Sequence, residues 1–132
     1  SLHAPDDVLR TEIVPTNDKI GLDAILEAAD YFLRTTGRQV TFEYVMLADR
    51  NDRPEQARAL ARLLRARQAH INLIPFNDVN GLVYRRPATE AITLFQTILR
   101  NAGLSVKVRK RKGSQIDAAC GQLRHQETKT RS

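Results

Sequence analysis

Cysteine is nearly absent from this sequence of 132 residues, which contains a single one, Cys120. One thiol cannot form an internal disulfide, and it excludes a cysteine-rich metal site built from this chain alone. The scarcity of cysteine fits a reducing compartment, and we therefore expect a cytoplasmic protein.

Long apolar runs are missing as well. No run approaches the roughly 18 residues that a membrane-spanning helix needs, so we expect no membrane partner. Residues 1–7 contain neither a basic start nor an apolar stretch, which argues against a signal peptide. The chain begins with Ser1 rather than methionine. We therefore expect it to start inside a longer sequence.

Aromatic residues make up only 5% of the chain and tryptophan is absent, so stacking of bases on exposed rings is not a strong expectation. Apolar residues make up 42% and charged residues 27%, which is typical of a globular protein. The length suits one domain with a real core, or part of a larger domain.

The positive charge is concentrated in the last quarter of the chain. Residues 1–99 hold 12 basic and 13 acidic side chains, whereas residues 100–132 hold nine basic and two acidic ones. The densest part contains Lys107, Arg109, Lys110, Arg111 and Lys112. Such a basic segment indicates a nucleic-acid partner. The alternative is a solvated strand end followed by a polar tail.

Hydrophobic periodicity predicts helices that alternate with strands. Apolar residues at helical spacing predict helices over 22–33, 53–67 and 89–101, with Gly37 and Gly103 just past two of their ends. Apolar and β-branched runs predict strands over 40–47, 70–76 and 104–109. We expect loops over 5–20 and 77–88 and a short helix near 116–123. This order predicts an α/β fold with a parallel sheet, incomplete and open at two edges.

Two local motifs refine the predicted boundaries. Asp52 followed by Glu55 forms a capping-box pattern, and Pro54 lies in the first helical turn, where its missing N–H costs nothing. Pro75 is expected to end the hydrogen bonding of the second strand.

Residues after parallel strands are candidates for binding, because ligands of such sheets lie at the carboxyl ends of the strands. Residues 1–3 resemble the end of a truncated strand, Asn77 follows the second full strand and residues 108–110 end the third. Taken alone, His3 is more often a structural hydrogen-bond partner, and Asn77 more often caps a turn.

Cys120 has small neighbours, Ala119 and Gly121, and follows the basic segment. Nearby cations lower a thiol pKa and favour the nucleophilic thiolate, although a lone cysteine is most often a buried apolar residue.

Several segments together resemble the C-terminal half of radical-SAM RNA adenine methyltransferases, the RlmN/Cfr family, in register over about residues 1–123. The segment that carries the most specific resemblance is Asp117-Ala118-Ala119-Cys120-Gly121-Gln122-Leu123. The others are Ser1-Leu2-His3-Ala4-Pro5, Glu12-Ile13-Val14-Pro15, Val40-Thr41-Phe42-Glu43-Tyr44-Val45-Met46-Leu47, Asn72-Leu73-Ile74-Pro75-Phe76-Asn77 and Val108-Arg109-Lys110.

The resemblance implies a partial (β/α) barrel that holds a 4Fe-4S cluster and S-adenosylmethionine. It implies that Cys120 is the methyl-carrying cysteine, and that a radical formed from a second S-adenosylmethionine activates its methyl group for addition to adenine. A second cysteine then releases the product. Ser1, Leu2, His3 and Asn77 match the family's S-adenosylmethionine-binding positions.

In the family, the three cysteines of the cluster motif, the second catalytic cysteine and an RNA-binding region lie upstream, and this chain has none of them. A cluster needs cysteine thiolates that one residue cannot supply. We therefore expect residues 1–123 to be the C-terminal part of the barrel domain and 124–132 a disordered polar tail. The missing N-terminal half is then a required partner, whether the chain is a cut piece or the product of a split gene.

The expected activity of the complete protein is methylation of carbon 2 of an adenine in large-subunit rRNA, with tRNA as a second candidate substrate. The fragment alone is expected to be inactive. Two alternatives stay open, namely a carbon-8 methyltransferase of the same family and a non-catalytic RNA-binding module that uses Lys107, Arg109, Lys110, Arg111 and Lys112.

Overall fold

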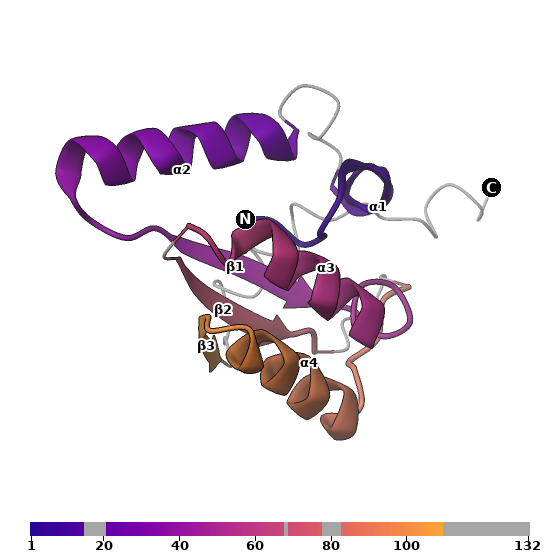
Figure 1. The fold of residues 1–132 in the computed structure, drawn as a ribbon. Helices are drawn as coiled ribbons and strands as arrows, with labels where there is room; N and C mark the ends of the chain where they lie inside the picture. Colours follow the sequence, from indigo (N-terminus) through magenta and orange to yellow (C-terminus); the bar gives the residue numbers. More distant parts are fainter. Residues whose placement is uncertain (15–20, 68, 78–82, 110–132) are drawn as a thin grey trace.

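The computed structural model describes residues 1–14, 21–67, 69–77 and 83–109 (Figure 1). Helices and strands alternate along the chain after a first short helix. In order, they are α1 (Asp7–Ile13), α2 (Leu22–Thr36), β1 (Thr41–Met46), α3 (Pro54–Leu64), β2 (His70–Pro75), α4 (Thr89–Asn101) and β3 (Ser105–Val108).

The described strands form a parallel sheet in the order β1-β2-β3. Thr41 pairs with His70, and His70 pairs with Ser105. Each crossover contains a helix, as parallel neighbours require. The α/β class predicted from the sequence is confirmed, with strand ends that differ from the prediction by at most one residue.

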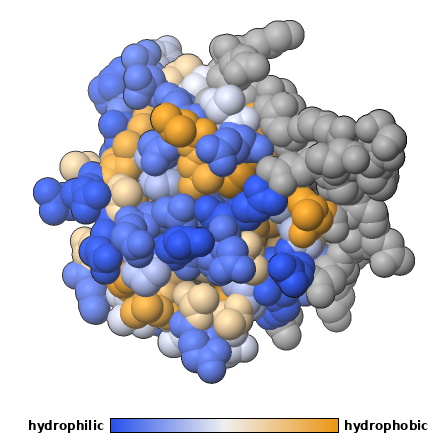
Figure 2. All heavy atoms as spheres, turned by 90° about the vertical axis from the view of Figure 1, so that its right-hand side faces the viewer, coloured by the Kyte–Doolittle hydropathy of each residue, from blue (hydrophilic) through white to orange (hydrophobic). Residues whose placement is uncertain are grey.

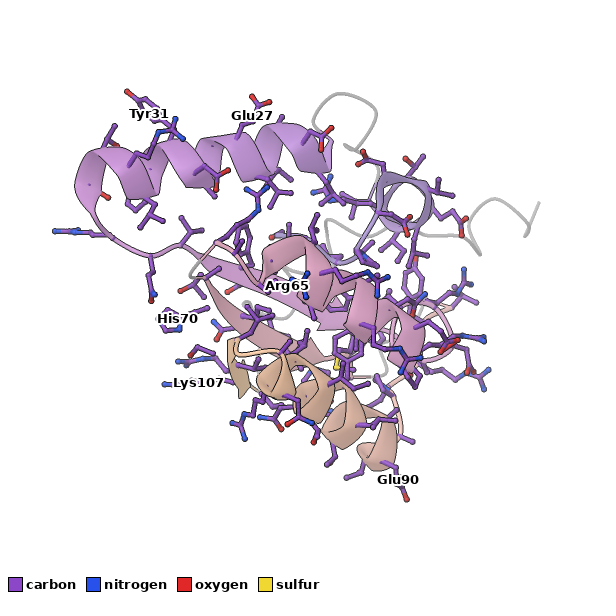
Figure 3. All side chains as sticks on the ribbon, viewed as in Figure 1. Glu27, Tyr31, Arg65, His70, Glu90 and Lys107 are labelled. Atoms are coloured by element: carbon purple, nitrogen blue, oxygen red, sulfur yellow. The ribbon has the colours of Figure 1, made fainter. Side chains whose placement is uncertain are left out.

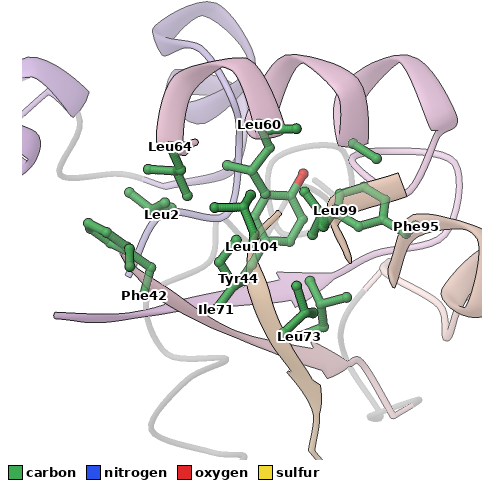
Figure 4. Close-up of a cluster of buried hydrophobic side chains, with 14 of the residues drawn as sticks. Leu2, Phe42, Tyr44, Leu60, Leu64, Ile71, Leu73, Phe95, Leu99 and Leu104 are labelled. Atoms are coloured by element: carbon green, nitrogen blue, oxygen red, sulfur yellow. The ribbon is translucent and has the colours of Figure 1, made fainter. Parts of the chain in front are cut away.

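The main core lies between the helices and one face of the sheet, here called the helix face (Figure 4). Phe42 and Tyr44 of β1 pack there with Leu60 of α3 and Phe95 of α4, and the rings of Tyr44 and Phe95 lie 5.3 Å apart. Because side chains alternate along a strand, the residues between them point to the other face, here called the inner face.

The inner face is polar in its first half and apolar in its second half. Glu43, whose direction the sequence left open, lies on this face, because its neighbours Phe42 and Tyr44 are on the helix face. Further along the strands, Val45 and Ile74 are buried with Ile13 and Tyr84 in a second, smaller cluster. The apolar half is therefore the half near the carboxyl ends of the strands.

Helix α2 lies apart from the other helices in Figure 1. It buries Leu22 and Leu26, but Tyr31 is 62% exposed and Phe32 is 42% exposed. Its end was predicted correctly: Gly37 adopts a left-handed conformation with φ of 71°, and its N–H donates to the carbonyl of Leu33.

Three local expectations were wrong. The first concerns residues 5–20, expected as a loop, which contain α1. The side chain of Asp6 accepts a hydrogen bond from the N–H of Leu9 at 2.9 Å and so caps this helix. A helix of seven residues shows too few periods to be recognised from apolar spacing.

The second concerns the cap of α3, which lies one residue later than predicted. The side chain of Asp52 accepts the N–H of Asp49 instead, so Arg53 becomes the cap residue and Gln56 accepts its N–H at 3.0 Å. Pro54 does occupy the first turn, as expected.

The third concerns Pro75, which does not end the hydrogen bonding of β2. The N–H of Phe76 donates to the carbonyl of Met46 at 3.0 Å. Successive residues of a parallel strand bond to opposite neighbours. The N–H that Pro75 lacks would therefore face β3, and only its pairing on that side is lost.

Several predictions fall outside the described residues. These are the short helix near 116–123, the tail over 124–132, Cys120, and the basic residues Lys110, Arg111 and Lys112. Within the described part, no helix is both long and apolar enough to cross a membrane.

Candidate functional site

Residues 1–3 lie beside β1 and extend the sheet at that edge. The N–H of Leu2 donates to the carbonyl of Glu43 at 2.8 Å. The N–H of Val45 donates to Nδ1 of His3 at 3.0 Å. The prediction of a strand-like segment at this position agrees with these contacts.

The His3 side chain replaces a backbone acceptor in this pairing. It is 1% exposed and has a left-handed backbone with φ of 64°. Because Nδ1 accepts from Val45, the ring proton of the neutral imidazole is assigned to Nε2. The structural hydrogen-bond role that the sequence left open for His3 is therefore present.

Asn51, which no sequence motif singled out, holds this segment in place. Its Nδ2 donates to the carbonyls of His3 and Val45, both at 2.8 Å. Its Oδ1 accepts the N–H of Leu47 at 2.7 Å. The side chain thus supplies the donors and acceptor that another strand would have supplied.

Arg10 fixes the first two residues from the opposite side. Its Nε donates to the carbonyl of Leu2 at 2.9 Å, and its terminal nitrogen donates to the carbonyl of Ser1 at 3.0 Å. Burial lowers the pKa of Arg10, and the nearby charge of Asp7 opposes this. The carbonyls of Ser1 and Leu2 are both engaged by this guanidinium.

Asn77 follows the central strand β2 at the carboxyl end of the sheet, whereas residues 1–3 lie along the side of β1. Its Oδ1 accepts a hydrogen bond from a terminal nitrogen of Arg86 at 2.9 Å. Val45, which contacts His3, pairs with Ile74, three residues before Asn77. From strand spacing and rise, His3 and Asn77 are on the order of 15 Å apart. One ligand of nucleoside size could therefore approach both residues.

The described part of the basic segment lies elsewhere. Lys107 and Arg109 line a shallow hollow of about 200 Å³ in the polar half of the inner face, together with His70 and Asn72. Nε of Arg109 donates to Oδ1 of Asn72 at 3.3 Å. Figure 3 shows Lys107 and His70 close together at the amino-terminal end of the strands. The structure therefore does not bring Lys107 together with Asn77.

The chain is similar in sequence to proteins described as probable dual-specificity RNA methyltransferases RlmN. That from Rhodopirellula baltica is 53% identical over 124 residues, which is 94% of this chain and 33% of the relative. That from Carboxydothermus hydrogenoformans is 47% identical, over 94% of this chain and 36% of the relative. No protein-family model matches the chain.

A solved structure shows the same similarity at the level of the fold. The crystal structure of a radical SAM methyltransferase from Sphaerobacter thermophilus matches 94% of this chain with a TM-score of 0.83 and 44% identity. These matches support an RlmN/Cfr-family fragment. Its parallel sheet is part of a radical-SAM barrel, and it spans about a third of the length of the RlmN relatives and of the solved structure.

The two cofactors that the RlmN/Cfr family implies fit this chain differently. Among the described residues, no group of three or more His, Cys, Asp or Glu side chains could hold a metal ion. The whole sequence offers one cysteine. The donors of this chain alone therefore do not fit a 4Fe-4S cluster, which requires several thiolates.

S-adenosylmethionine fits the edge in part. The half-buried carboxamide of Asn77 is a polar group of the type that orients a nucleoside or amino-acid moiety. His3 fits less directly, because it is buried and its Nδ1 already accepts the N–H of Val45. Its position instead fixes the backbone of Ser1 and Leu2, the other two residues that match binding positions.

Proposed function

We propose that this chain is the C-terminal part of a radical-SAM methyltransferase that modifies RNA. Its substrate would be an adenine of large-subunit rRNA, methylated at carbon 2, with tRNA as a second substrate. The observation that supports this most is the 53% identity, over nearly the whole chain, to a relative described as a dual-specificity RNA methyltransferase. In this proposal residues 1–123 complete the barrel and 124–132 form a tail.

S-adenosylmethionine would bind near the carboxyl ends of the strands, between Asn77 after β2 and the segment Ser1, Leu2 and His3 beside β1. One bound molecule would supply the methyl group, and a second, cleaved by a reductant, would supply the radical that activates that group. The residues of this chain act by position. Arg86 orients the Asn77 carboxamide, while Arg10 and Asn51 keep residues 1–3 rigid.

Cys120 would carry the methyl group as a thioether before its transfer to the base. Thiolates are strong nucleophiles, and the cations before Cys120 in the sequence would favour the thiolate. In the complete protein, Cys120→Ala should abolish methylated adenine but leave formation of 5′-deoxyadenosine possible. Mass spectrometry of digested RNA and of the small-molecule products measures both.

Ser114→Ala, six residues earlier, is the matched control and should retain product. Near-normal methylation by Cys120→Ala would mean that the cysteine only packs, and the proposed role would be wrong. Methylation at carbon 8, identified by co-elution with synthetic 8-methyladenosine, would replace the carbon-2 assignment and keep the rest of the proposal.

The second candidate is a non-catalytic RNA-binding module, and the placement of Lys107 and Arg109 favours it. Both side chains line the polar hollow at a distance from Asn77, so they could bind RNA without taking part in chemistry. Replacing Arg109, Lys110, Arg111 and Lys112 with Ser should flatten the dependence of RNA affinity on salt. An unchanged slope would refute this surface as an RNA contact.

Ultraviolet-visible spectra of the complete protein after anaerobic reconstitution with iron and sulfide separate the two candidates. The methyltransferase should show the absorption of an iron–sulfur cluster, whereas a binding module should remain colourless.

A further inference from the structure

Two loops at the C-terminal edge of the sheet enclose a hollow of about 410 Å³. One loop follows β1 and the other precedes α4, and the N–H of Ala48 joins them by donating to the carbonyl of Arg85 at 2.9 Å. The polar walls of the hollow are Asp49, Asp52, Arg85 and Arg86, and its floor includes Ala88. We call this feature the rim hollow.

Two guanidinium groups line the rim hollow, and a third, that of Arg50, lies over the ring of Tyr84. Arg85 and Arg86 line it, and Arg86 also contacts Asn77. The guanidinium of Arg50 lies 5.4 Å from the ring centre of Tyr84, the residue before Arg85. Tyr84 is itself buried and packs edge-on against Phe76, with ring centres 6.1 Å apart. The arginines therefore occupy defined positions.

The two acids of the rim hollow oppose these cations only in part. Asp52 is nearly buried, and its carboxylate accepts the N–H of Asp49 as part of the turn before α3. Burial raises the pKa of Asp52, and its backbone hydrogen bonds oppose this. Glu90, in the first turn of α4, is labelled at the outer end of that helix in Figure 3. An anion in the hollow would therefore meet two guanidinium groups, those of Arg85 and Arg86, and one exposed carboxylate, that of Asp49.

A count of charges along the sequence does not predict this arginine surface. Residues 1–99 are nearly neutral in total, and Arg50 is far from Arg85 along the chain. The fold brings them together through the parallel pairing of β1 with β2. Figure 2 looks onto this edge of the molecule, where hydrophilic side chains form a band across the middle of the face.

We propose that Arg50, Arg85 and Arg86 bind a backbone phosphate of the RNA strand beside the target adenosine. The proposal rests on the proposed function, because it requires the adenosine to reach the edge that Asn77 occupies. Arginine suits this task, since its planar guanidinium can bond two phosphate oxygens at once. This surface is separate from the basic segment, whose described residues lie in the other hollow.

The test uses the complete protein that contains this chain and a fluorescent fragment of large-subunit rRNA. The double variant Arg50→Ser with Arg85→Ser should weaken RNA binding about tenfold. The slope of log affinity plotted against log salt concentration should also become shallower by roughly two, because each phosphate contact contributes nearly one to that slope. Arg86 is left intact because it contacts Asn77. Arg50→Lys with Arg85→Lys should restore the slope, since the charge is retained.

Arg62→Ser with Arg65→Ser is the matched control, because both arginines are exposed near the opposite end of α3 (Figure 3). It should leave the slope unchanged. If the intact protein binds and methylates RNA and the Arg50/Arg85 double variant keeps its slope, the rim proposal alone is wrong. If the intact protein neither binds nor methylates RNA, the proposed function fails and the rim proposal fails with it.

Discussion

The side chain of Asn51 makes hydrogen bonds that a neighbouring strand would otherwise make. Its carboxamide is fully buried and bonds the N–H of Leu47 and the carbonyls of His3 and Val45. Asn51→Ala should therefore leave three buried backbone groups without these partners and lower the free energy of unfolding by about 3 kcal/mol. Urea unfolding of the 132-residue chain measures this loss.

Asn101→Ala is the control for Asn51→Ala, because Asn101 is exposed at the end of α4. Its effect should stay within about 0.5 kcal/mol, as for most surface substitutions. A loss below about 1 kcal/mol for Asn51→Ala would show that water replaces the carboxamide and that residues 1–3 do not depend on it.

Tyr44 makes the stability of the chain sensitive to alkaline pH. Burial raises its pKa well above the ordinary value of 10.0, and the charges of Asp52 and Asp6 add to the effect. The folded state therefore holds the phenolic proton more tightly than the unfolded state. The resulting stability is complete below the unfolded pKa and is lost as pH rises from about 10 towards the folded pKa.

The measurement is the free energy of unfolding at about pH 8 and about pH 11. The wild-type chain should lose more stability between these values than Tyr44→Phe, which has no phenolic proton. The variant should begin about 1 kcal/mol lower because it loses the bond to the carbonyl of Asn51 at 2.7 Å. Parallel pH profiles would contradict a role for Tyr44 in this loss.

At this scale the sequence predicts which residues lie at the edge but not what they contact. Asn77 does follow the carboxyl end of β2, as expected from the helix–strand alternation, whereas residues 1–3 lie beside β1, with Leu2 bonded to Glu43 in the middle of that strand. The bond between His3 and Val45 and the role of Asn51 depend on contacts more than 40 residues apart in sequence. Local patterns carry no information about such pairs.

Among the elements, α3 offers the sharpest test because its cap was predicted one residue too early. Gln56 accepts the N–H of Arg53 and donates to the carbonyl of Arg50 at 2.9 Å. Gln56→Ala should lower the free energy of unfolding by about 1 kcal/mol, the usual cost of losing a cap. Glu55→Ala should change it by no more than about 0.5 kcal/mol. If thermal or urea unfolding showed a larger loss for Glu55→Ala than for Gln56→Ala, the capping box first predicted from Asp52 and Glu55 would be correct.

The other elements show why periodicity works and where it stops. The residues of α4 were predicted without error, because Ile92, Phe95 and Leu99 repeat over three turns and are buried as expected. The helix α1 was missed because seven residues are too short for a repeat to emerge. The cap of α3 shifted because the Asp52 carboxylate accepts the N–H of Asp49 in the preceding turn, a contact that the spacing of residues does not reveal.

For the whole molecule, the length and the donor set lead to one prediction. The 132-residue chain alone should form no 5′-deoxyadenosine from S-adenosylmethionine, even with iron, sulfide and a strong reductant, because one cysteine cannot hold the cluster. Liquid chromatography with mass spectrometry detects the product, and the complete protein serves as the positive control. Formation of 5′-deoxyadenosine by this chain alone would contradict the prediction.

The family, the parallel fold and the edge that holds the candidate residues could all be derived from the sequence. The rim arginines could not, because the charge of residues 1–99 cancels in a count and Arg50 meets Tyr84 only after β1 and β2 have paired. Lys107 gives the opposite lesson. The dense run of positive charge predicted an RNA partner for Lys107. In the structure, the side chain of Lys107 lines the polar hollow, at a distance from Asn77.

The anchoring of residues 1–3 by Asn51 also bears on the order in which the chain assembles. His3 is joined to Val45 and Asn51 across 42 and 48 residues of sequence. Contacts of such long range close slowly, because the loop between them must be ordered first. On the ribosome, residues 1–3 leave the exit tunnel well before Asn51. Residues 1–3 therefore reach their bonded positions only after β1 and the turn that follows it have emerged.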